Sequence, residues 1–246
     1  NTSSVAFSPD GKKLAITHNW SPGITVYDWN GTTYTKMPAL ESASSSGYAA
    51  SFSPNGTIIA VAHKSSPGIT LYRWNGTTYL KMPALEAVAD DGTGVAFSPN
   101  GLRLAVTHTV VPLISVYEWD GATFKKMAAL DRLAGRGRAV KFIDNNKFVA
   151  VHEGSPYITS YKWNGTEFVK SNDLDALPGI GYDISYSPTA RRIAAAHANS
   201  PYITVYNGEY DFSKEESFSS DTDVVFIARE TKASGEAANA YEIAIT

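Results

Sequence analysis

Apolar and polar residues alternate along most of the chain, in short runs that are separated by turn-forming residues. Residues 13–18 and 24–29 follow this alternation and are rich in β-branched and aromatic side chains, which is typical of strands. Residues 8–11 read Ser-Pro-Asp-Gly, a sequence that favours a turn. Asn30 followed by Gly31 is a strong hairpin signal and predicts a type I′ turn, in which both central residues take a positive φ.

One pattern recurs about every 45 residues. All five histidines keep this interval, at spacings of 45, 45, 44 and 45, together with four of the five tryptophans and five tyrosines. A period in this range indicates a solenoid, a propeller or an array. The residues in phase are His18, His63, His108, His152 and His197; Trp29, Trp74, Trp119 and Trp163; Tyr27, Tyr72, Tyr117, Tyr161 and Tyr206; and Phe7, Phe52, Phe97, Phe142 and Tyr186.

The inside of each repeat decides among these architectures. It has room for four short antiparallel strands and none for a helix, and four strands in 40–45 residues make one propeller blade. We therefore expect an all-β fold, a single β-propeller domain of four-stranded antiparallel blades with six or seven blades in the complete ring. The sequence predicts five full repeats and a partial sixth, at about 1–40, 47–85, 92–130, 137–174, 181–218 and 223–246.

The repeats also carry recognisable motifs. The sequence VAFSPDGKKLA followed by ITVYDW resembles the WD40-like β-propeller repeat, and the resemblance covers residues 1 to about 218. The stretches AHxxSPYITVY and WNGTTYxKM are similar to a WD40-like variety found in proteins of tailed bacteriophages and prophages. This second resemblance implies a virion structural protein.

Composition and charge exclude several other classes. The 21 Lys and Arg residues are balanced by 24 Asp and Glu, and the net charge of −3 argues against a chain that coats nucleic acid. The chain has no cysteine, so disulfides, thiol nucleophiles and cysteine metal sites are absent. No apolar run approaches the roughly 20 residues that span a bilayer, so we expect no membrane insertion. No cofactor motif is present, and none is expected to be bound.

The copies differ most in two sets of loops. These are the loops between the second and third strands, which begin at each histidine, and the blade-to-blade connections at about 40–48, 85–94, 130–139 and 174–182. In a propeller both sets emerge on one face, and variable loops on a constant scaffold usually carry binding specificity. The residues expected to contact a protein partner are Trp20, Val110, Val111, Arg132, Arg136, Arg138, Tyr157 and Tyr202.

The periodic histidines and aromatics have a structural and a functional interpretation. One histidine per blade leaves the rings too far apart to share a zinc ion at about 2 Å, so we expect hydrogen bonding to neighbouring loops rather than a metal site. The tyrosine and tryptophan ladders are expected to pack between blades rather than to stack on carbohydrate. Trp20 lies outside the ladder, in a loop.

Three functions stay open at this point. We expect a non-enzymatic virion protein that decorates a capsid or tail or binds a host surface receptor, with other virion subunits as its partners. The alternative is a bacterial interaction scaffold in the cytoplasm or periplasm. A lactonase-like propeller enzyme is disfavoured, because the inner-strand residues at 5–8, 50–53, 95–98, 140–143 and 184–187 contain no carboxylate.

Overall fold

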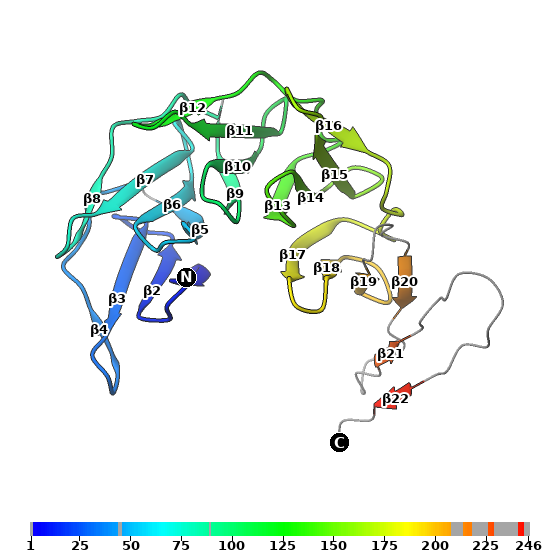
Figure 1. Cartoon of the computed structure of the whole chain (residues 1–246), viewed down its shortest axis with the longest axis horizontal. Coiled ribbons are helices and arrows are strands. Elements are labelled where there is room, and N and C mark those ends of the chain that lie inside the picture. Colours follow the sequence, from blue (N-terminus) through cyan, green and yellow to red (C-terminus); the bar gives the residue numbers. More distant parts are fainter. Residues whose placement is uncertain are drawn as a thin grey trace.

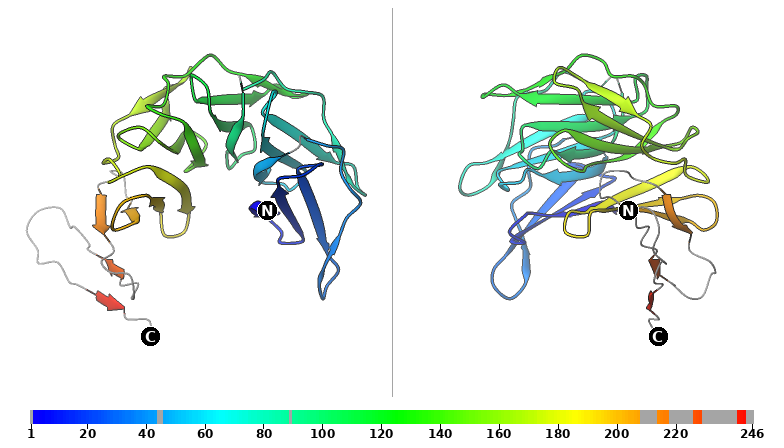
Figure 2. Two further views of the ribbon diagram at one scale, coloured as in Figure 1. Left: turned by 180° about the vertical axis from the view of Figure 1, so that it is seen from behind. Right: turned by 45° about the vertical axis from the view of Figure 1, so that its right-hand side comes forward.

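The computed structural model describes residues 2–43, 46–88 and 90–207 and three further short strands, and every regular element among them is a strand. Five four-stranded antiparallel sheets follow one another along the chain, and in each the strands pair in sequence order. The sheets stand as blades in an arc, with the first and fifth blades at its two ends (Figures 1 and 2). The prediction of a propeller with five full blades is confirmed. The strands are β1 Thr2–Phe7, β2 Lys13–His18, β3 Ile24–Trp29 and β4 Tyr34–Lys36; β5 Gly47–Phe52, β6 Ile58–His63, β7 Ile69–Trp74 and β8 Tyr79–Lys81; β9 Gly92–Phe97, β10 Arg103–His108, β11 Ile114–Trp119 and β12 Phe124–Lys126; β13 Gly137–Phe142, β14 Lys147–His152, β15 Ile158–Trp163 and β16 Phe168–Ser171; β17 Gly181–Ser187, β18 Arg192–His197, β19 Ile203–Asn207 and β20 Lys214–Ser217; and β21 Phe226–Ala228 and β22 Tyr241–Ile243.

Beyond the fifth blade, β21 and β22 pair with each other as a two-stranded antiparallel sheet. The remaining residues of the expected sixth repeat lie outside the described part of the chain, so a sixth blade stays a prediction. No helix long and apolar enough to cross a membrane occurs among the residues that the structure describes.

The core lies between blades rather than within any one of them. One cluster joins Ala60 and Leu71 of the second blade to Leu104 and Tyr117 of the third, and all four are buried. In the second, third and fourth blades the second strand is covered on both faces, and β6 is buried along its whole length. Two-sided burial explains why the middle strands read as nearly continuous apolar runs.

The hairpin between β3 and β4 corrects the expected type I′ turn. The strands pair up to Trp29 and Tyr34, which leaves a four-residue loop. Only Gly31 takes a positive φ there, of 100°, and the Asn30 side chain instead accepts hydrogen bonds from the amides of Thr32 and Thr33 at 3.0 and 2.9 Å. Asn-Gly is therefore used as a side-chain cap followed by a left-handed glycine.

The loops between second and third strands lie against the blade-to-blade connections, as expected. The carbonyl of Pro22 accepts from the amide of Ala43 at 3.0 Å, and the same bond joins Pro67 to Val88 at 3.0 Å. The serine–proline or valine–proline peptide bond in each of these loops is cis. Both variable loop sets thus share one face of the propeller, and backbone hydrogen bonds link them.

The inner strands begin earlier than the sequence pattern suggested, and this corrects two assignments. Arg138 lies on β13 and not in the connecting loop. Asp183 lies on β17 and lines the central hollow, so a carboxylate is present where none was expected. The sequence did not predict the first residues of these strands, because apolar and polar side chains do not alternate clearly there. Each inner strand borders the hollow on one side, and on that side it has no apolar neighbour.

Candidate functional site

Each repeat histidine is held inside its own blade. The Nε2 atom of His63 lies 2.9 Å from the hydroxyl of Thr70, and its Nδ1 lies 3.0 Å from the carbonyl of Lys64. Because a carbonyl can only accept, Nδ1 carries the proton and Nε2 accepts from the threonine. The pairing with a hydroxyl seven residues further on recurs in all five blades, and this hydroxyl lies on the third strand of the same blade, whereas the sequence predicted a partner in a neighbouring loop; the pairs are His18–Thr25, His63–Thr70, His108–Ser115, His152–Thr159 and His197–Thr204.

These buried histidines predict a loss of stability in mild acid. Burial lowers the pKa of His108 and of His152 to about 4. In the unfolded chain a histidine has a pKa near 6.5, so between pH 6.5 and 4 the unfolded state binds more protons than the folded state, and stability falls as pH falls. We expect urea unfolding at pH 5 to give a free energy lower than at pH 7.5 by about 1–2 kcal/mol for each of His108 and His152.

The His108→Gln variant is the matched control for this titration, since glutamine cannot be protonated there. It should show a smaller difference between pH 7.5 and pH 5 than the parent protein. Aspartates whose pKa is lowered, such as Asp10, titrate below this window and leave the comparison clean. Equal stability of the parent protein at the two pH values would contradict the assignment.

The periodic aromatics pack between blades, as expected. The hydroxyl of Tyr72 donates to the carbonyl of Glu41 in the preceding connection at 2.7 Å, and burial raises the pKa of this tyrosine. The indole of Trp74 lies under the Lys13 ammonium of the preceding blade, 4.1 Å from the ring centroid. These rings therefore stabilise the contact between neighbouring blades.

Three of the five loops between second and third strands expose apolar residues that were predicted to contact a protein partner. Trp20 is 53% exposed and stacks on His18, with ring centroids 4.5 Å apart. Val111 is 58% exposed and Tyr202 54%, while Val110 is also exposed. They project from the first, third and fifth blades, so the intervening blades separate them and they form no single apolar patch.

The other residues predicted to contact a partner do not all lie at exposed loop tips. Tyr157 packs against the core cluster of the fourth and fifth blades and is half-buried. Arg132 is exposed in the third connection, and Arg136 is half-buried beside it. Arg138 pairs with Glu153 at 2.5 Å and lies 5.9 Å from the ring of Tyr182, so it belongs to the wall of the hollow.

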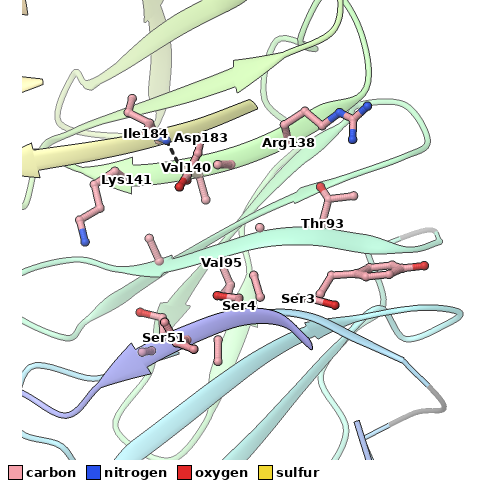
Figure 3. A pocket seen from close by; sticks show the side chains of 18 of the residues that line it. Ser3, Ser4, Ser51, Thr93, Val95, Arg138, Val140, Lys141, Asp183 and Ile184 are labelled. Atoms are coloured by element: carbon pink, nitrogen blue, oxygen red, sulfur yellow. Dashed lines mark hydrogen bonds between the residues drawn. The ribbon is translucent and has the colours of Figure 1, made fainter. Parts of the chain in front are cut away.

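The hollow at the centre of the arc has a volume of about 620 Å³ and is lined by the inner strands of all five blades. Figure 3 shows Arg138 and Thr93 toward one end of it and Lys141 toward the other. The residues at one equivalent position of the five inner strands all carry a hydrogen-bond donor: Ser3, Tyr48, Thr93, Arg138 and Tyr182. The sequence analysis did not predict this ring, although its members recur at intervals of 44 or 45 residues.

The chemistry of the hollow is mixed. It combines two cationic side chains, Arg138 and Lys141, with the carboxylate of Asp183, which accepts from the amide of Ile184 at 2.8 Å. No group of three or more His, Asp or Glu side chains that could hold a metal ion occurs among the described residues. The hollow can hold a polar ligand through these groups.

Comparisons with known proteins extend the fold assignment. No protein-family model and no curated protein matches the sequence. Among solved structures, the chain is similar to a functionally unknown protein from Desulfotomaculum acetoxidans, with a TM-score of 0.71 and 13% identity over 88% of this chain and 69% of that one. It is also similar to a candidate 6-phosphogluconolactonase from Bacteroides uniformis, with a TM-score of 0.65 and 12% identity over 86% and 69%. At these identities the likeness shows the propeller fold alone.

Proposed function

We propose that the protein is a non-enzymatic binding module that contacts its partner through the loop face. The observation that carries this proposal is the construction of the loops. Their backbones are fixed by repeated hydrogen bonds, as where the carbonyl of Trp20 accepts from the amide of Gly23 at 2.7 Å, while three of the five tips expose large apolar side chains. A loop that is already ordered loses little entropy on binding, and exposed aromatic side chains are common anchors of protein interfaces.

Within this role, a virion protein of a tailed bacteriophage is the more specific candidate, as a decoration of the capsid or tail or in adhesion to the host surface. The resemblance of the repeat motifs to phage WD40-like proteins supports it. A cysteine-free scaffold whose turns are fixed by side-chain caps also suits a repetitive protein lattice. A bacterial interaction scaffold would use the same loops with a cellular partner.

An enzymatic alternative is favoured by one observation, the polar hollow with Arg138, Lys141 and Asp183. The candidate lactonase among the similar structures has the same fold, but a fold does not carry an activity with it. Addition of the protein to 6-phosphogluconolactone would test this alternative: hydrolysis faster than the spontaneous reaction, lost in Asp183→Asn, would support it.

Fractionation of the native source on a density gradient tests the virion role. Mass spectrometry of each fraction measures this chain against the major shell and tail proteins. We expect it to migrate with particles at a fixed ratio to one of those proteins. Recovery only among free proteins would overturn the virion role and leave the cellular scaffold.

A further inference from the structure

The outer face of the first blade is exposed where the matching faces of the other blades are buried. Val5 and Phe7 on β1 are 64% and 59% exposed, whereas Val95 and Phe97, at the same positions of the third blade, are both 8% exposed. Leu14, Ile16 and Tyr27 are half-buried on this face, and their counterparts in blades two to five are fully buried. The first blade therefore presents half of an interface that is completed four times elsewhere in the chain.

Two contacts recur at the completed interfaces, one in all four and one in three, and both are missing at this face. The tyrosine of a later blade donates to a carbonyl of the preceding connection, as Tyr117 does to Glu86 at 2.6 Å, but the Tyr27 hydroxyl donates to no carbonyl among the described residues. A cation of the preceding blade covers the tryptophan in three interfaces, whereas Trp29 is 39% exposed.

The fifth blade presents the opposite half of the same interface. Ile203 on β19 is 39% exposed, whereas Ile114, its counterpart in the third blade, is fully buried. Arg192 stands at the position of Lys13 and is exposed. It donates to Asn207 at 2.8 Å, in the same cross-strand arrangement in which Lys13 pairs with Asp28. Arg192 thus has the position from which Lys13 covers the tryptophan of the next blade.

We propose that the fifth blade of one copy docks on the first blade of a second copy, in the arrangement of the four interfaces within the chain. Ile203 and Phe7 would then both be buried in the contact, and Arg192 would lie over Trp29. A second copy is the occupant because this chain itself carries both halves of the contact. Such a head-to-tail contact either closes into a ring or continues as a chain of copies.

Sedimentation velocity of the full chain tests this contact. The parent protein is expected to associate as its concentration rises, and Phe7→Glu and Ile203→Glu should each weaken association by about tenfold or more, since each variant replaces a buried apolar side chain with a carboxylate that must lose its hydration. Leu80→Glu is the matched control, because Leu80 is equally exposed at 54% but lies on the outer strand β8. A parent protein that stays monomeric at all concentrations would overturn the proposal.

Mixing the two variants gives the sharper outcome. Phe7→Glu keeps an intact fifth blade and Ile203→Glu keeps an intact first blade, so an equimolar mixture should form a 1:1 dimer and nothing larger. A mixture that remains monomeric while the parent protein associates would also overturn a head-to-tail contact. Circular dichroism confirms that each variant is folded, and Val5→Glu replaces Phe7→Glu should the latter misfold.

Discussion

Replacement of Gly92 by alanine is expected to lower the free energy of unfolding by about 3 kcal/mol or more. An alanine Cβ at this position would lie 2.1 Å from the carbonyl oxygen of Gly68 and 3.1 Å from its carbon. The obstacle is backbone, and it is held in place because the same carbonyl accepts from the amide of His63 at 3.0 Å. Neither partner can move without breaking the junction between the loop and the inner strand.

Urea denaturation of Gly92→Ala beside Gly11→Ala separates this steric effect from backbone strain. Gly11 has a φ of 69°, and an alanine Cβ there would meet no atom within 4 Å, so this substitution should cost only the strain of about 1 kcal/mol. Equal losses in the two variants would show that the close approach at Gly92 is not what matters.

The second large effect is expected from Asp173→Ala. The ammonium of Lys147 is buried in the fourth blade and pairs with Asp173, whose other oxygen accepts from the hydroxyl of Ser160 at 2.5 Å. Burial lowers the pKa of Lys147, and the hydrogen bond to Asp173 opposes this shift. Removing the carboxylate leaves a buried charge without its counter-ion, and the free energy of unfolding should fall by about 3 kcal/mol.

The second blade supplies the control for this pair. Ile58 stands at the position of Lys147 and is buried, and Ala84 stands at the position of Asp173. The double variant Lys147→Ile with Asp173→Ala copies that apolar solution and should lie within about 1 kcal/mol of the parent protein in thermal or urea unfolding. A double variant as unstable as Asp173→Ala alone would refute this explanation.

Much of this fold could be predicted because the same four-stranded blade occurs five times along the chain. The recurrence of histidine, tyrosine and tryptophan predicts the blade boundaries, since their contacts repeat along the chain: the histidine contact recurs in all five blades and the tyrosine contact in the second to fifth. The hairpin geometry could not be predicted from Asn30 and Gly31 alone, because Asn-Gly suits both a two-residue turn and a four-residue capped loop.

The candidate site was predicted only in part. The exposure of Trp20 and Val111 could be predicted because they lie in loops whose sequence varies between repeats. Tyr157 lies in an equivalent loop, but it packs against the core instead. The ring of hydrogen-bond donors in the hollow was missed because its residues lie near the beginnings of the inner strands, before the positions at which the sequence pattern predicts each strand to start. Arg138 shows the consequence: a charge interpreted as belonging to a loop lies in the wall of the hollow.

The contact through the loop face is tested most directly by cosedimentation of purified variants with particles isolated from the native source. The variant Trp20→Ser with Val111→Ser changes two loop tips, and Leu80→Ser with Leu102→Ser changes two residues of comparable exposure elsewhere. We predict that the loop variant binds about tenfold more weakly or worse, while the control binds like the parent protein. Undiminished binding of the loop variant, with loss in an Arg138→Gln variant of the hollow, would contradict the account.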